Sequence, residues 1–383
     1  MKGHSANIDK LLRIAHCQGV GPVIFGRLLN FFGSVEKVLD ASMSALAKVE
    51  GIGEKTAEKI FKSKNDFNVE KELELADKFD VCIIDITDDR YPSPLKKIYD
   101  PPPVLYIKGD FKPSDNLAIA IVGSRQCSNY GSEQASRFAH LLAASGFTII
   151  SGMARGIDSA AHNGALSANG RTIAVQGCGL SKIFPPENKN LFEKIYASGA
   201  CISELPMEYE PLAENFPARN RIIAGLCLAT IIVEAMPRSG ALLTAQAALE
   251  NNREVMAIPG KVDSPLSKGP HKLIKQGAKL VESVEDVIEA LEFLQIDFQQ
   301  HVKDTNAKAV EKVQKELFDT SKLNLTETER KILDCLDGEP VHIEEIISKT
   351  QFAAGKVSAT LVSMRLKGLV KQFPGNYFVK RIS

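Results

Sequence analysis

Several short segments of this chain combine glycine or other small residues with an arginine or lysine side chain. Small residues let a phosphate approach the backbone, and arginine forms paired hydrogen bonds to phosphate oxygens. A segment that also opens a helix adds free N–H groups and a positive dipole end. One such loop alone is more often a simple chain reversal, but several on one edge predict a phosphate-binding groove. Its candidate residues are Gly123, Ser124, Arg125, Ser151, Gly152, Arg155, Gly156, Lys182, Asn188, Arg238 and Ser239.

A further basic segment, residues 215–221, has the sequence NFPARNR and adds Arg219, Asn220 and Arg221. Phe184, two residues after Lys182, is a candidate stacking platform for an unpaired base. Packing beneath the Pro185-Pro186 turn is at least as good a role for this ring.

Asp158 precedes His162 by about one helical turn, so the two side chains could meet as an acid–base pair. We favour a helix-capping or loop-tying role for the carboxylate. The chain has no GxGxxG with a downstream acid, no P-loop lysine motif, no HExxH and no GxSxG. Its seven cysteines include no CxxC pair. We therefore expect no catalytic residue, cofactor, metal or disulfide, and reduced thiols as in the cytosol.

The candidate residues follow short apolar runs between residues 117 and 281, in a repeated order of strand, glycine loop and helix. Such unalternating runs are typical of parallel strands covered on both faces, and right-handed crossovers then give a doubly wound, mostly parallel Rossmann-like α/β sheet. Ligands bind outside the carboxyl ends of such strands, so these loops should converge there. The predicted strands are residues 117–122, 147–150, 172–176, 201–204, 230–233 and 254–258.

The first 66 residues predict a small all-α domain. Gly19-Val-Gly and Gly51-Ile-Gly each enter an apolar-periodic helix, in a pattern that resembles a helix-hairpin-helix motif. Such glycines free backbone N–H groups to face a DNA phosphate. A helix–turn–helix packing unit without a ligand explains two copies equally well.

The last segment predicts a winged-helix domain over residues 323–383. Thr326 and Glu329 form a capping box, and two more helices are expected at 343–349 and 356–367, with a hairpin over 368–380. Winged helices bind DNA or dock proteins, and the fold alone does not choose between these roles.

The remaining boundaries follow from composition. Residues 67–298 form the extended Rossmann-like domain, which begins with a helix at 67–80 and a strand at 81–86, and residues 299–322 are polar and predict a linker. No signal peptide or membrane-length apolar run is present, so we expect a cytoplasmic protein. Because 47 basic and 47 acidic residues cancel, any nucleic-acid site must be local.

Four motifs occur in an order that resembles the DNA-processing protein A family, also called DprA or Smf, across residues 75–295. They are SGMARGIDSAAHNGAL, GCGLSKIFPPEN, NFPARNRIIAGL and EAMPRSGALLTAQAALENNREVMAIPG. The resemblance implies a non-enzymatic recombination mediator that binds and protects incoming single-stranded DNA in natural transformation and loads the RecA recombinase. It also implies a homodimer and places Arg125 and Lys182 at positions that the family uses for DNA.

Three positions depart from the family pattern. Met153 stands where a glycine is common, Cys227 where a serine is common, and His271 where an asparagine is common. Met153 would narrow a loop that could approach the ligand, and the other two bear on packing or dimerisation.

The alternative function is a nucleotide-binding enzyme of the phosphoribohydrolase (lysine-decarboxylase-like) type, which shares this architecture. Its PGGxGTxxE motif is matched only in layout by EAMPRSGALLTAQ, which lacks the final glutamate. That difference disfavours catalysis. A scaffold role through the winged helix is compatible with DNA binding.

Overall fold

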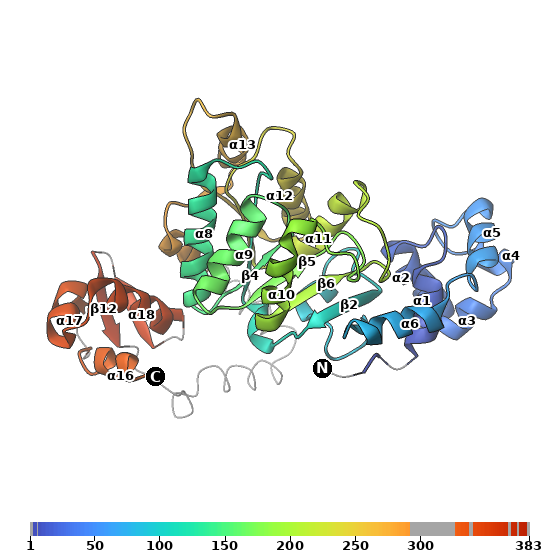
Figure 1. Ribbon diagram of the computed structural model, residues 1–383, viewed down its shortest axis with the longest axis horizontal. Helices are drawn as coiled ribbons and strands as arrows, with labels where there is room; N and C mark the ends of the chain where they lie inside the picture. The colour runs from blue at the N-terminus through green and yellow to red at the C-terminus, as the bar shows by residue number, and fades with distance from the viewer. Residues whose placement is uncertain are drawn as a thin grey trace. The chain divides into compact units, whose positions relative to one another are not determined.

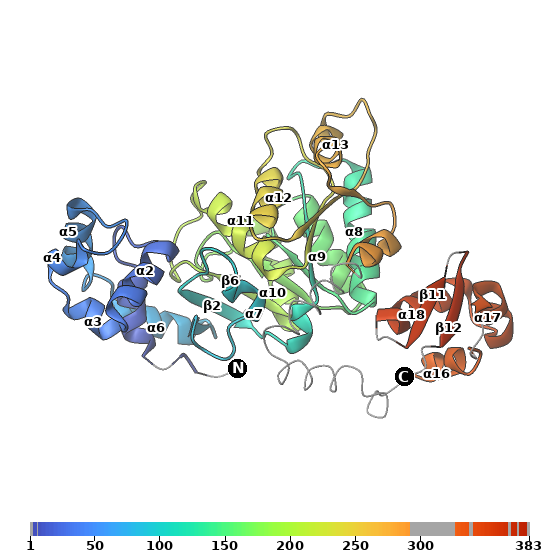
Figure 2. The same ribbon diagram turned by 180° about the vertical axis from the view of Figure 1, so that it is seen from behind.

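The computed structural model describes residues 3–5, 7–291, 326–336, 340–366, 369–373 and 375–380 (Figures 1 and 2). The chain divides into two compact units, one of Met1–His140 with Phe147–Leu280 and one of Leu141–Gly146 with Val281–Ser383. Each is described separately below. The predicted linker at 299–322 lies outside the described residues.

A nine-stranded sheet forms the centre of the first unit, in the order β1-β2-β6-β5-β4-β3-β7-β8-β9. Every pair from β6 to β9 is parallel, whereas β2 pairs antiparallel with both β1 and β6. The predicted mostly parallel sheet is confirmed. The strands are β1 (Cys82–Asp85), β2 (Val104–Gly109), β3 (Ala118–Val122), β4 (Thr148–Ser151), β5 (Thr172–Val175), β6 (Ala200–Ser203), β7 (Ala229–Ile232), β8 (Glu254–Ala257) and β9 (Lys279–Leu280).

The parallel part of the sheet is doubly wound. The chain starts at the central strand β3, steps outward through β4 and β5 to β6, and then returns to place β7 on the other side of β3. The carboxyl ends of β3 and β7 therefore form a topological switch point, where open α/β sheets bind ligands. The crossover helices are α8 (Asn129–Ala144), α9 (Ile157–Ser167), α10 (Lys189–Ser198), α11 (Asn215–Leu226), α12 (Gly240–Glu250) and α13 (Lys268–Lys275).

Among the described residues, six helices precede the sheet: five lie within the segment predicted to be all-α, and the sixth corresponds to the helix predicted at 67–80. The two glycine turns are equivalent, because Gly21 caps the start of α2 and Gly53 caps the start of α5. Helix α6 packs on β1. The helices are α1 (Ile8–Ala15), α2 (Pro22–Phe32), α3 (Val35–Asp40), α4 (Met43–Leu46), α5 (Glu54–Ser63) and α6 (Val69–Lys78), with the short α7 (Ser93–Lys96) between β1 and β2.

The winged helix in the second unit has its own core, which includes Ile332, Ile346, Leu361 and Phe378. The Thr326–Glu329 capping box is present in both directions. A third strand, β10, joins the predicted hairpin. Of the helix predicted at 283–298, residues 284–291 are helical and the rest is outside the described range. The elements are α16 (Glu327–Leu333), β10 (Val341–His342), α17 (Ile343–Thr350), α18 (Ala354–Leu366), β11 (Val370–Phe373) and β12 (Tyr377–Lys380).

All seven cysteines are free thiols, and five of them are buried. Among the helices that the structure describes, none has the length and apolarity to cross a membrane.

Candidate functional site

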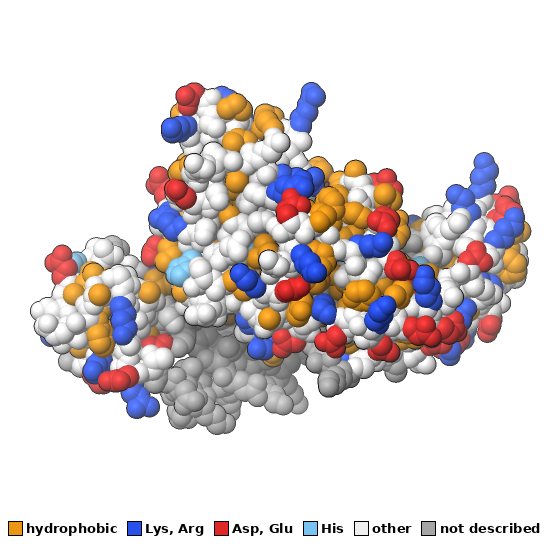
Figure 3. Space-filling view, viewed as in Figure 1, with side chains coloured by type: hydrophobic (Ala, Val, Ile, Leu, Met, Phe, Trp, Pro, Cys, Tyr) orange, Lys and Arg blue, Asp and Glu red, His pale blue; other side chains and the backbone are white. Residues whose placement is uncertain are grey.

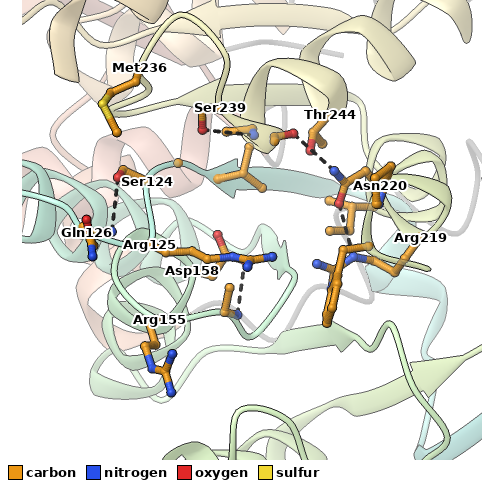
Figure 4. A pocket seen from close by; sticks show the side chains of 18 of the residues that line it. Ser124, Arg125, Gln126, Arg155, Asp158, Arg219, Asn220, Met236, Ser239 and Thr244 are labelled. Atoms are coloured by element: carbon orange, nitrogen blue, oxygen red, sulfur yellow. Dashed lines mark hydrogen bonds between the residues drawn. The ribbon is translucent and has the colours of Figure 1, made fainter. Parts of the chain in front are cut away.

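A pocket of about 550 Å³ opens at the switch point of the sheet (Figure 4). Its wall comes from the loops after β3, β4 and β7 and from the start of α11. The predicted convergence of these loops on one sheet edge is therefore observed. The candidate residues that line the pocket are Gly123, Ser124, Arg125, Arg155, Arg219, Asn220, Arg238 and Ser239.

Two of these arginines are exposed and have no hydrogen bond or ion pair to any described residue. Arg125 follows β3, and its guanidinium lies 5.2 Å from the centre of the Phe216 ring, a cation–π contact. Arg238 lies in the loop after β7. Both cations are free to bind an anion in the pocket.

Arg155 is exposed and Lys182 is half-buried, and each of them meets a carboxylate. Arg155 pairs with Glu187, and Lys182 Nζ lies 2.9 Å from Glu210 Oε1. Lys182 lies outside the pocket wall. The hydrogen bond from Arg155 lowers the pKa of Glu187, and the hydrogen bond to Glu210 raises the pKa of Lys182. Both cations are therefore already paired with a carboxylate.

Arg219 forms part of the pocket floor and is only 5% exposed. Its Nη1 donates to the carbonyl oxygens of Gly152 (2.8 Å) and Val175, and burial lowers the pKa of this guanidinium to about 10. The group lies against Gly152, where a Cβ would collide with it. Arg219 therefore holds the floor together, and the neighbouring Asn220 donates to Gly240 O at 3.3 Å.

Asp158 ties the loop after β4, which confirms the role favoured from sequence. Its Oδ2 accepts hydrogen bonds from the backbone N–H groups of Gly152 (3.2 Å) and Ala154 (3.3 Å). His162 is fully buried, its Nδ1 lies 2.7 Å from Thr172 Oγ1, and burial lowers its pKa to about 3. This imidazole is a packing group of α9.

Arg221 lies outside the pocket, although it is only two residues from Arg219. Its guanidinium pairs with Asp100 at 2.8 Å and with Glu204 at 2.6 Å, and its side chain is 13% exposed. Side chains two positions apart on a helix project from nearly opposite sides, so α11 directs the two arginines away from each other. The geometry assigns Arg221 to the stability of the fold.

The other candidates position the loops. Ser151 is buried and donates to Ile121 O at 2.7 Å, and Gly156 caps the start of α9. Asn188 donates to Met153 O and to Ser159 Oγ. Phe184 is half-buried, with its ring centre 5.7 Å from that of Phe216.

Two residues that shape the site were not among the candidates. Glu234 is buried, and its carboxylate accepts hydrogen bonds from Ser128 N (2.8 Å) and Ser128 Oγ (2.6 Å). The backbone carbonyl oxygen of Glu234 accepts a hydrogen bond from Ser124 N. Glu234 thereby fixes the loop that carries Arg125. Phe216 lies beneath that arginine. Both belong to the motifs quoted above, but their contacts depend on loops that are distant in sequence.

Met153 adopts a left-handed backbone conformation with φ of 56°, which glycine tolerates better than methionine. Its side chain is fully buried and does not line the pocket. The expectation that Met153 narrows the ligand-facing loop is therefore wrong. His271 contacts Gly260 through Nε2.

The comparisons with known proteins cover all three predicted regions. Residues 82–292 match a family model described as DNA recombination-mediator protein A. Residues 318–376 match the DprA winged helix domain, and residues 8–63 match a SAM-like helix-hairpin-helix tandem.

Curated relatives agree. Protein Smf of Synechocystis is 38% identical over 397 residues, which cover 98% of this chain and 100% of the relative. DNA processing protein DprA of Streptococcus pneumoniae is 43% identical over 229 residues, which cover 60% of this chain and 79% of the relative.

Two solved structures are similar to this one. The X-ray structure of DprA from Streptococcus pneumoniae has a TM-score of 0.64 at 36% identity, covering 75% of this chain and 98% of that chain. DprA from Helicobacter pylori, described as having a unique single-stranded DNA binding mode, has a TM-score of 0.51 at 29% identity, covering 56% of this chain and 96% of that chain. Because a family model and a full-length relative agree, this chain belongs to the DNA recombination-mediator protein A family, the Smf/DprA proteins.

Proposed function

We propose that the chain binds single-stranded DNA by its phosphate backbone at the switch-point pocket and acts as a recombination mediator. The observation that carries the proposal is the pair of exposed arginines, Arg125 and Arg238, which pair with no carboxylate of the described residues. Neighbouring small residues and the start of α12 add backbone donors. The Helicobacter pylori relative that binds single-stranded DNA supports this ligand.

Binding of a poly-dT oligonucleotide tests the proposal. The wild type and the double variant Arg125→Ala/Lys182→Glu are compared at about 50 mM and about 200 mM salt. We expect weaker binding by the variant and a clear loss of wild-type affinity at the higher salt, because phosphate contacts release counterions. Equal binding by both proteins at both salt concentrations would rule out the pocket.

The same proposal includes no catalytic step. Asp158 is committed to backbone N–H groups, and His162 is buried against Thr172. Incubation with nucleoside monophosphates should release no free base above the buffer control. Release above that level would favour the phosphoribohydrolase alternative.

The proposal has four further parts: RecA loading, protection of incoming DNA in natural transformation, a homodimer and a cytoplasmic location. They follow from membership of the family, and free cysteines fit a reducing compartment. RecA filament formation on the oligonucleotide, with and without the chain, tests the loading step. Sedimentation equilibrium tests the dimer.

A further inference from the structure

We propose that residues 206–210, which we call the acidic strap, hold Glu210 on Lys182 and so restrain binding of a phosphate backbone. The strap has the sequence PMEYE and lies within the connection between β6 and α11. This inference rests on the proposed function, because it concerns the affinity of the same DNA site.

One side of the strap is locked onto the loop that carries Lys182. The N–H of Gly179 donates to Tyr209 O at 2.9 Å, and the N–H of Ser181 donates to Met207 O at 3.1 Å. Ser181 Oγ also donates to Met207 O. A Cβ at Gly179 would collide with the carbonyl oxygens of Pro206 and Met207, so the two backbones approach as closely as glycine allows.

The other side of the strap is anchored on α6, in the helical segment. The carboxylate of Glu72 is only 6% exposed and accepts a hydrogen bond from Met207 N at 2.7 Å. Lys71 pairs with Glu208 at 2.5 Å. The helical segment therefore positions the strap, and Met207 is fully buried between the two attachments.

This arrangement determines where Glu210 lies. Its Oε1 is 2.9 Å from Lys182 Nζ, and the two side chains are 63% and 40% exposed. The carboxylate occupies the position that a phosphate oxygen would need. Because the pair is exposed, water and salt weaken it, so DNA can displace Glu210 at a modest cost.

Salt-dependent binding of a dT oligonucleotide tests the strap. Glu210→Gln should bind about two- to fivefold more tightly than the wild type, the range that corresponds to one exposed ion pair. The slope of log affinity against log salt should steepen by about 0.7, because Lys182 gains a phosphate contact. The matched control is Glu214→Gln, which removes the same charge from an exposed side chain that pairs with no cation among the described residues. It should leave the slope unchanged.

The proposal for the acidic strap is wrong if Glu210→Gln and Glu214→Gln change DNA affinity equally, or if neither changes it. Arg125→Ala is measured in the same series and reports on the DNA site itself. If Arg125→Ala binds as tightly as the wild type, the proposed function fails. If it binds more weakly while the two glutamate variants agree with each other, only the strap fails.

The anchor on α6 has its own test. Glu72→Leu removes the acceptor for Met207 N. Introduced alone, it should raise DNA affinity above that of the wild type, but added to Glu210→Gln it should cause no further increase. Glu72→Gln keeps an acceptor oxygen and should retain wild-type affinity. An unchanged affinity in folded Glu72→Leu would contradict the anchor, and the Glu210 comparison decides the proposal if that variant does not fold.

Discussion

The arginines of the candidate site differ in what their guanidinium groups contact. Within the part of the chain that the structure describes, Arg125 and Arg238 are exposed and pair with no carboxylate. Arg219 donates to carbonyl oxygens in the pocket floor, and Arg221 forms ion pairs with two carboxylates. The sequence predicts that arginines gather at this edge, since that follows from strand order. How deeply each guanidinium is buried, and which group it pairs with, depends on the direction of the side chain and on residues from distant loops. The spacing of residues within a motif does not specify either.

Replacing Arg125 should weaken DNA binding directly. We expect Arg125→Ala to bind a dT oligonucleotide about tenfold more weakly, since a charged hydrogen bond to phosphate is lost. The salt slope should fall by about 0.7. Fluorescence anisotropy measures both. Lys194→Ala removes an exposed lysine of α10 that does not line the pocket, and a similar loss in that control would refute a local role for Arg125.

Replacing Arg221 should affect stability instead. Arg221→Ala leaves Asp100 and the half-buried Glu204 without their cation, and desolvation already raises the pKa of Glu204. We expect the free energy of unfolding to fall by about 2–4 kcal/mol, as for a partly buried pair. Urea unfolding measures this change, and DNA affinity of the folded variant should remain that of the wild type. If the variant binds DNA more weakly but is as stable as the wild type, Arg221 contributes to DNA binding and not to stability.

Among the elements, the parallel strands were the most predictable, because β3, β4 and β5 are buried throughout and their apolar runs are continuous. The antiparallel pairing of β2 with β6 depends on where the chain enters the sheet, which local sequence does not encode. Strand β10 contains only Val341 and His342, too few residues for an alternating pattern.

The contact between α9 and β5 should make stability depend on pH. Burial lowers the pKa of His162 to about 3, so it stays neutral in the folded state while the unfolded chain protonates below a pH of about 6.5. The unfolded state then binds more protons, and the free energy of unfolding falls between about pH 7 and about pH 5.

His162→Gln should make that decline shallower by about 1–2 kcal/mol over the same range. Chemical unfolding of both proteins at each pH measures the difference. Because carboxyl groups that titrate in both proteins cancel, parallel declines would show that His162 does not contribute.

The start of α16 should depend on its capping box. Thr326 Oγ1 accepts from Glu329 N at 3.2 Å, and Glu329 Oε2 accepts from Thr326 N at 2.9 Å. Thr326→Ala should destabilise the helix by about 1 kcal/mol. Hydrogen exchange of the α16 amides in the full chain should accelerate about fivefold, and unchanged exchange would mean that the cap is not stabilising.

At the scale of the whole molecule, the net charge of zero remains the main constraint. On the face shown in Figure 3, lysine and arginine side chains alternate with aspartate and glutamate, without an extended basic band. A neutral chain exerts little long-range attraction on DNA, so the proposed function requires short-range contacts in the pocket to supply the affinity. We therefore expect the DNA affinity of this site to depend strongly on a few lysine and arginine side chains.

An oligonucleotide with a neutral backbone tests the central claim most directly. Binding of dT is compared with binding of the same sequence in which methylphosphonates replace the phosphates. We predict that the wild type binds the neutral strand at least tenfold more weakly, and that Arg125→Ala/Lys182→Glu narrows this difference. Equal affinity of the wild type for the two strands would contradict a phosphate-binding site.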